Sequence, residues 1–197
     1  RALSLCRRVC AKLDPAPPVI ELDATSEESL AALPGALREN GFDRIDGVLH
    51  SIAFANPETA LGGGFLTTGW DDVATALHTS TYSYPALAMA LKDMMGPGSS
   101  VVGLTFDATI SWPSYDWMGV AKAGLESANR YLARYLGPDG IRANLVSAGP
   151  IDSLAKKAIP GSASLNDVWD ERAPLGWNAK DATPVGTVIC ALLSDLF

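Results

Sequence analysis

Three segments of the chain are apolar along almost their whole length: residues 45–53, 99–106 and 142–149. A strand with one face in water alternates apolar and polar side chains, whereas a strand buried on both faces is apolar throughout. Helical segments separate these apolar runs, and parallel strands need such crossover connections. The sequence therefore predicts an α/β fold, in which helices cover both faces of a doubly wound parallel sheet.

The segments around these runs carry helical periodicity and defined ends. We expect helices over residues 2–13, 26–41, 68–95, 115–136 and 181–196, and a further short strand over residues 19–23. The glycine run at 62–64 is expected to form a flexible surface loop, and residues 153–166 a polar loop. No internal repeat or low-complexity linker divides the sequence, so residues 1–197 are expected to form a single domain.

Ligands of open parallel sheets bind beyond the carboxyl ends of the strands. The residues at those ends are Asp23 and Ala24, residues 51–54, Phe106, and residues 149–153. Tyr115 and Lys122 follow the strand that ends at Phe106, so we expect them to face the same crevice.

Tyr115 precedes Lys122 by seven residues at the start of a helical segment. Seven residues are about 20° short of two helical turns, so both side chains are expected on one face of the helix. An ammonium group favours the phenolate, so the pair is expected to lower the pKa of Tyr115 and to form a proton donor. The alternative is a partly buried tyrosine and a solvated lysine without a catalytic role.

The net charge of −7 argues against a general binder of nucleic acids or membrane surfaces, because phosphate binding requires an excess of lysine and arginine. Cys6, Cys10 and Cys190 are odd in number and have no further metal ligands close in sequence. We therefore expect reduced thiols, no metal site and a cytoplasmic protein. No run of residues predicts a signal peptide or a transmembrane helix.

Several motifs occur in the order found in one enzyme family. They are His50-Ser51-Ile52-Ala53-Phe54, Tyr115 with Lys122, Trp117-Met118, Ala148-Gly149-Pro150-Ile151 and Arg172-Ala173-Pro174-Leu175-Gly176-Trp177. On these motifs the chain resembles the NADH-dependent enoyl-acyl-carrier-protein reductases of the short-chain dehydrogenase superfamily, most closely the actinobacterial long-chain type. The resemblance covers essentially all 197 residues and implies a Rossmann-like sheet.

Spacing separates this family from other short-chain dehydrogenases, which place the tyrosine four residues before the lysine. That position here is Met118, which cannot donate a proton, whereas Tyr115 matches the spacing of the enoyl reductases. Many bacterial enoyl reductases carry a second tyrosine upstream, and the actinobacterial type carries phenylalanine there, as this chain does at Phe106.

The resemblance implies that NADH delivers hydride to the β-carbon of a trans-2-enoyl thioester in fatty acid elongation. Tyr115 would hydrogen-bond the thioester oxygen as an enolate develops, Lys122 would bind the nicotinamide ribose, and Phe106 would pack against nicotinamide and substrate. The implied cofactor-binding residues are Asp23, Ala24, Ser51, Ile52, Ala53, Lys122, Gly149, Pro150, Ile151 and Ser153. The implied substrate-binding residues are Phe106, Tyr115, Met118 and Ile159, with core packing as the alternative for the last two.

The resemblance also implies a substrate carried by acyl carrier protein and a homotetrameric full-length parent. Carrier proteins are acidic, so Lys156, Lys157 and Arg172 are candidates for a landing site, with solvated surface charges as the alternative. Lys156 replaces a residue that is typically apolar in the acyl pocket of the family.

Family members begin with a strand and a glycine-containing turn that holds the NAD pyrophosphate at a helix N-terminus. The glycines at 62–64 do not have the spacing of that turn. We therefore expect an incomplete sheet that lacks the first strand–turn–helix, the second strand and the last strand, and a chain that is inactive by itself. The alternatives are a short-chain reductase acting on carbonyls and a truncated module without catalytic activity.

Overall fold

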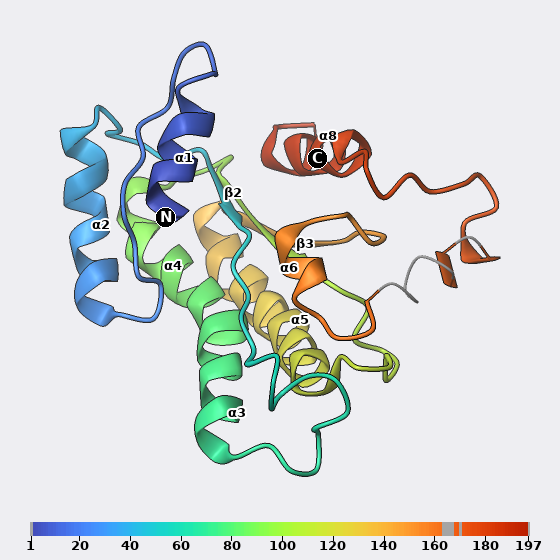
Figure 1. The fold of residues 1–197 in the computed structure, drawn as a ribbon. Coiled ribbons are helices and arrows are strands. Elements are labelled where there is room, and N and C mark those ends of the chain that lie inside the picture. Colours follow the sequence, from blue (N-terminus) through green and yellow to red (C-terminus); the bar gives the residue numbers. More distant parts are fainter. Residues whose placement is uncertain (1, 163–167, 170, 197) are drawn as a thin grey trace.

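The computed structural model describes residues 2–162, 168–169 and 171–196, whose arrangement is shown in Figure 1. Three parallel strands form one sheet in the order β1 (Gly47–His50), β2 (Ser100–Thr105) and β3 (Arg142–Ser147). The α/β fold with a parallel sheet, predicted from the apolar runs, is thereby confirmed, and so is the Rossmann-like sheet that the family resemblance implied. Each strand is shorter than its apolar run, because the residues at the run ends leave the ladder to form the edge loops.

The helices of the described residues are α1 (Ala2–Cys10), α2 (Glu27–Glu39), α3 (Trp70–Leu77), α4 (Ser83–Leu91), α5 (Asp116–Leu136), α6 (Leu154–Lys157) and α8 (Thr183–Leu193). Three short helical turns follow α3, α4 and α5: η1 (His78–Tyr82), η2 (Lys92–Met94) and η3 (Gly137–Asp139). None of the helices in the described ranges is long and apolar enough to cross a membrane. All three cysteines are free thiols, as expected.

Helices α2, α4 and α5 cover one face of the sheet. Val101 in β2 pairs with Val48 in β1 and Ala143 in β3. These three side chains share a buried cluster with Tyr84 of α4 and Leu125 of α5. Burial of apolar side chains from both sides of this contact fixes α4 and α5 against the strands.

Helix α8 covers the opposite face, at the amino ends of the strands. The buried Ser100 hydroxyl donates to the Leu192 carbonyl at 2.7 Å. The Arg142 guanidinium donates to the carbonyls of Leu192 and Ser194 at 2.9 and 2.5 Å. These bonds satisfy the last carbonyls of α8, which a helix leaves without partners of its own. Helices therefore cover both faces of the sheet, as predicted.

The predicted strand over residues 19–23 is wrong. The segment is extended but joins no ladder in the described part of the chain. Ile20 and Leu22 pack against the apolar cluster that contains Leu30 of α2, and the Asp23 N–H donates to the Ser29 hydroxyl at 3.0 Å. A strand requires a neighbour for its backbone groups, and apolar periodicity does not identify one.

The helix predicted over residues 68–95 is interrupted by η1, a single π-helical turn. The Ser83 hydroxyl donates to the Thr79 carbonyl at 2.6 Å, and the Thr81 hydroxyl donates to the Ala121 carbonyl of α5 at 2.6 Å. Serine and threonine hydroxyls compete with the regular hydrogen bonds of a helix, and this run of them accounts for the interruption.

Gly103 marks the closest approach of β2 to its surroundings, because a Cβ there would lie 2.6 Å from Leu145 and 3.1 Å from the Tyr84 ring. We expect Gly103→Ala to lower the free energy of unfolding by about 1–3 kcal/mol through overpacking. Gly186→Ala in α8 is the control, because its Cβ would meet nothing within 4 Å. A helical Gly-to-Ala change there is expected to raise stability by up to about 1 kcal/mol. Urea denaturation measures the free energy of unfolding of both variants. An unchanged value for Gly103→Ala would contradict the close packing around Gly103.

Candidate active site

The candidate catalytic side chains gather at the carboxyl end of β2. Phe106 follows β2 directly, and Tyr115 stands immediately before the first turn of α5. The rings of Phe106 and Tyr115 lie 5.1 Å apart between centroids. Lys122 of α5 donates from Nζ to the carbonyl of Leu104 in β2 at 2.8 Å. The structure therefore brings the phenol, the ammonium group and Phe106 to one strand end.

Tyr115 is buried in an apolar cluster that also contains Trp112, Met118 and Ala121. Burial raises the pKa of its phenol above the ordinary value, because the phenolate would lose its hydration. The hydroxyl has no hydrogen-bond partner among the described residues. A neutral phenol with an unused donor is thus held at the end of β2.

Lys122 is 6% exposed, and burial lowers the pKa of its ammonium group to about 8. The Leu104 carbonyl accepts one of its three protons, and the other two have no acceptor in the part of the chain that the structure describes. The expected lowering of the Tyr115 pKa by Lys122 is wrong for this structure. Desolvation of the buried phenol outweighs any attraction by the ammonium group.

A cavity of about 560 Å³ opens beside Tyr115. Its walls are residues 108–112, Phe65, and the side of α5 that carries Gly119 and Ala123. Tyr115 lines this cavity, whereas Lys122 is directed to β2 and does not. A molecule in the cavity would therefore meet the phenol and not the ammonium group.

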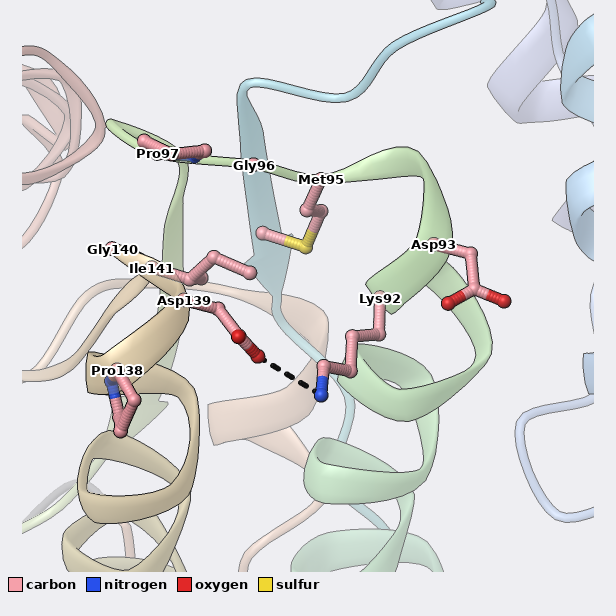
Figure 2. Close-up of a pocket in the computed structure, with 9 residues that line it drawn as sticks. All are labelled: Lys92, Asp93, Met95, Gly96, Pro97, Pro138, Asp139, Gly140 and Ile141. Atoms are coloured by element: carbon pink, nitrogen blue, oxygen red, sulfur yellow. Dashed lines mark ion pairs between the residues drawn. The ribbon is translucent and has the colours of Figure 1, made fainter.

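A second cavity, of about 620 Å³, lies near the amino ends of β2 and β3 (Figure 2). It is formed by the segments around η2 and η3, and an ion pair between Lys92 and Asp139 at 2.9 Å crosses it. None of the candidate catalytic or cofactor residues lines it. This cavity is therefore separate from the candidate active site.

Two tryptophans complete an aromatic cluster that the sequence analysis did not identify. The rings of Trp112 and Trp169 lie 5.1 and 6.1 Å from Phe106 and 5.7 Å from each other. The Arg172 guanidinium lies 5.1 Å from the centre of the Trp112 ring, a cation–π distance. Only Trp112 offered a sequence signal, because it stands three residues before Tyr115.

The predicted substrate residues join this aromatic cluster. Met118 is buried beside Tyr115, and Ile159 packs against the same group of side chains. Phe106, Tyr115, Met118 and Ile159 are therefore close together, although Ile159 comes from a distant part of the chain.

The segment that follows β1 is attached to η1 at one end and to the first residue of α4 at the other. The buried Ser80 hydroxyl accepts from the Phe54 N–H and donates to the Phe54 carbonyl, both at 2.9 Å. At the other end, His50 Nε2 lies 2.7 Å from the Ser83 hydroxyl. Residues 51–53, predicted to form part of a cofactor groove, lie between these attachments outside any ladder.

The loop after β3 is packed against two tryptophans. A Cβ at Gly149 would lie 2.5 Å from Trp169 and 2.6 Å from Trp177, and the Trp177 ring N–H donates to the Pro150 carbonyl at 2.8 Å. The Ser153 hydroxyl accepts from the Lys156 N–H of α6 at 3.1 Å. The predicted cofactor residues of this loop are thus already engaged by other parts of the chain.

Asp23 and Ala24 lie in the turn before α2. The exposed Asp23 carboxylate accepts from the N–H and hydroxyl of Thr25 at 2.9 and 2.6 Å, and these bonds lower its pKa. Ala24 is buried. Among the described residues, this turn makes no hydrogen bond or ring contact with Tyr115 or Lys122.

The glycine run lies in a surface loop, as the sequence predicted, and two of its amides are hydrogen-bonded. The Gly62 N–H donates to the Ser114 carbonyl at 3.0 Å, and the Gly63 N–H donates to the Asp116 carboxylate at 2.6 Å. The loop therefore binds the residues on either side of Tyr115.

A parallel Rossmann-like sheet with a tyrosine and a lysine beside the end of one strand is the arrangement of the short-chain dehydrogenase superfamily. A family model described as enoyl-(acyl carrier protein) reductase matches residues 1–197. The chain belongs to this family.

Curated relatives agree with this assignment. The enoyl-acyl-carrier-protein reductase (NADH) of Mycolicibacterium smegmatis is 46% identical over 206 residues, covering 98% of this chain and 76% of the relative. The protein of the same name from Mycobacterium avium is 44% identical over 208 residues, with the same coverage. An NADPH-dependent relative from Staphylococcus aureus is 40% identical over 184 residues, covering 89% of this chain and 68% of the relative. The resemblance to the actinobacterial type is confirmed.

His50 makes the fold sensitive to acid. It is 1% exposed, and burial lowers its pKa from 6.5 to about 4. Because the folded pKa lies below the unfolded value, the unfolded chain binds the proton more readily, and stability falls as the pH drops from 6.5 to 4. We expect a loss of up to about 3 kcal/mol over this window. Urea denaturation at several pH values measures this loss of stability, with His50→Gln as the non-titrating control. If the wild type and His50→Gln depend on pH equally, the loss does not come from His50.

Proposed function

We propose that this chain serves in the reduction of the trans-2 double bond of an enoyl thioester on acyl carrier protein, in fatty acid biosynthesis, with NADH as the hydride donor. The names of the mycobacterial relatives, which state this enzyme and NADH, support the proposal. The structural observation that carries it is Tyr115, which lines a cavity and whose ring lies 5.1 Å from that of Phe106.

The described residues fit the nicotinamide half of NADH. Two protons of the Lys122 ammonium group have no acceptor among the described residues, and ribose hydroxyls would accept them. We assign the ribose to Lys122 and the adjacent groove to Ser51, Ile52 and Ala53. These three residues follow β1 at the same edge of the sheet.

The fit is poorer for the carboxamide and pyrophosphate. We keep Gly149, Pro150, Ile151 and Ser153 as proposed contacts, but Trp169 and Trp177 pack against Gly149 and have to move before a ligand reaches it. Asp23 and Ala24 remain proposed adenine contacts, on the family resemblance alone.

NADH, when bound, supplies the hydride that adds to the β-carbon of the substrate. As negative charge grows on the thioester oxygen, the Tyr115 hydroxyl donates a hydrogen bond to it in a site with little competing water. The raised pKa of Tyr115 keeps the donating proton in place at neutral pH. Lys122, with a pKa of about 8, stays largely protonated at pH 7 and makes the local field positive. Phe106, Met118 and Ile159 offer an apolar wall for the acyl chain.

Tyr115→Phe tests the proposed reaction, because it removes the hydroxyl and keeps the ring packed on Phe106. Measured in the full-length parent, because this chain is expected to be inactive by itself, kcat for a trans-2-enoyl thioester is expected to fall by about 10²–10³-fold with little change in the KM for NADH. Lys122→Met is expected to raise the KM for NADH, and the exposed Tyr131→Phe is the control. Loss of NADH absorbance follows the reaction. A wild-type protein that reduces ketones and not enoyl thioesters would replace the proposal with the carbonyl reductase alternative.

We propose that the acidic carrier protein approaches the exposed Lys157 and Arg172. Lys156 contributes less, because its ammonium group pairs with Asp152 at 2.8 Å.

We also propose a cytoplasmic location, since three free thiols suit a reducing compartment.

We propose that further copies of this chain cover the outer side of η1, α4 and α5, as the homotetramer implied by the family resemblance would require. Four large side chains are more than half exposed on these elements: Tyr82, Met89, Tyr131 and Tyr135. Helices α4 and α5 lie side by side in Figure 1. Exposed apolar patches of this kind mark interaction surfaces.

Replacing Tyr131 and Tyr135 by lysine is expected to convert the oligomer to a smaller species, because buried like charges repel across a self-interface. Size-exclusion chromatography with light scattering measures the mass. Leu66→Lys is the control, since Leu66 is 93% exposed on a different part of the surface. A wild-type monomer, or a double variant of unchanged mass, would contradict the proposed interface.

A further inference from the structure

The loop at residues 60–64 binds the chain on both sides of Tyr115. Before the tyrosine, the Ser114 carbonyl accepts from the Gly62 N–H at 3.0 Å. After it, the Asp116 carboxylate accepts from the Gly63 N–H at 2.6 Å, a charge-assisted bond. Tyr115 itself makes no bond to the loop, so the loop controls the tyrosine through its neighbours.

Both of those neighbours have backbone conformations that side chains disfavour. Ser114 has a φ of 63° and Asp116 a φ of 40°, in the left-handed region. Residues other than glycine persist in this region only when the surrounding structure holds them there. The two loop bonds are the contacts that hold them, and the direction of the Tyr115 side chain depends on both angles.

The same loop also replaces the missing cap of α5. Tyr115 occupies the cap position but makes no capping bond with its side chain. The Ala60 carbonyl instead accepts from the Trp117 N–H at 3.2 Å, satisfying one of the free N–H groups of the first turn. The Phe65 ring stacks on the Trp117 ring with 4.9 Å between centroids, and the Phe65 carbonyl accepts from the Trp117 ring N–H at 3.1 Å. These contacts attach the residue that follows the loop to α5.

Glycine is required where the loop turns its amides toward α5. Gly62 and Gly63 have φ values of 77° and 99°, which residues with a Cβ rarely adopt. At Gly64 a Cβ would run into the Thr59 carbonyl. The positive φ values and the close contact with Thr59 therefore explain the three consecutive glycines without a role in phosphate binding.

We propose that the loop at residues 60–64 is a positioning element for Tyr115, with Gly63 and Asp116 as the positioning residues that set the direction of the phenol. The consequence for catalysis rests on the proposed function, because it concerns the hydrogen bond from Tyr115 to the thioester oxygen. The consequence for the geometry of Tyr115 does not rest on it.

Asp116→Ala tests the geometry, because it removes the acceptor of the Gly63 N–H. Incorporated fluorotyrosine reports on each of the five tyrosines by fluorine NMR, and Tyr115→Phe identifies the resonance of interest. We expect Asp116→Ala to move or broaden the Tyr115 resonance alone. Asp116→Asn, which keeps an acceptor and tolerates the left-handed region, is expected to restore it. A folded Asp116→Ala protein with an unmoved Tyr115 resonance overturns the proposal.

Gly63→Ala gives an independent test with a matched control. A Cβ meets nothing within 4 Å at Gly63 or at Gly41, and both have positive φ values, 99° and 86°. The two variants therefore carry similar backbone strain, but only Gly63 adjoins Tyr115. We expect the Tyr115 resonance to move in Gly63→Ala and to stay in place in Gly41→Ala. Equal effects of the two changes would overturn the proposal.

Kinetics separate this proposal from the proposed function. We expect Asp116→Ala to lower kcat for the enoyl thioester at least tenfold with the KM for NADH within about twofold, and Asp116→Asn to recover most of the loss. Because the chain is expected to be inactive by itself, the kinetics are measured on the full-length parent. If that wild-type protein reduces no enoyl thioester, the proposed function fails while the NMR experiment still decides the positioning role. A moved Tyr115 resonance with unchanged kcat would overturn the catalytic consequence.

Discussion

The contact between α5 and the central strand β2 is the constraint on which the site depends. Leu125 of α5 and Val101 of β2 are fully buried in one cluster, and the Lys122 ammonium group reaches across to the Leu104 carbonyl. A shift of one residue along either element would remove Tyr115 from Phe106 and Lys122 from the strand end. Apolar packing thus fixes the position, and one buried charged hydrogen bond fixes the register.

Polar groups buried around that contact reduce the stability that apolar packing supplies. The phenol of Tyr115, the ammonium group of Lys122 and the neutral imidazole of His50 have pKa values moved by desolvation in the direction that disfavours charge. Burying such groups costs free energy unless each polar atom is bonded, and His50 Nδ1 has no partner in the described ranges. Functional sites commonly carry this kind of cost.

Local order around the site comes from bonds between segments that are distant in the sequence. Ser80 holds Phe54, Thr81 holds the Ala121 carbonyl, and Gly63 holds Asp116. Each bond ends on a residue next to a proposed functional position and not on that position. The proposed reactive groups therefore keep unused donors, while their neighbours supply rigidity.

Much of the fold and part of the candidate site could be predicted from the sequence. The apolar runs predicted parallel strands because burial on both faces leaves no polar alternation. The spacing of Tyr115 and Lys122 predicted one shared helix face, whereas in the structure Tyr115 lines the cavity and Lys122 bonds to β2. The partners Trp112 and Trp169 were not identified, because no periodicity links Trp169 to Phe106. The catalytic roles of these residues stay predictions for the experiments above.

The sequence by itself determined the α/β class, the three parallel strands that form the sheet, and the family, since these follow from local patterns and ordered motifs. Only the tertiary structure decided whether residues 19–23 have a neighbouring strand, which residues the amides of the glycine loop bind, and in which direction the Tyr115 pKa moves. Those outcomes depend on which groups burial brings together and which it separates from water. Neither the groups that burial brings together nor those that it separates from water can be identified from residues near one another in the chain.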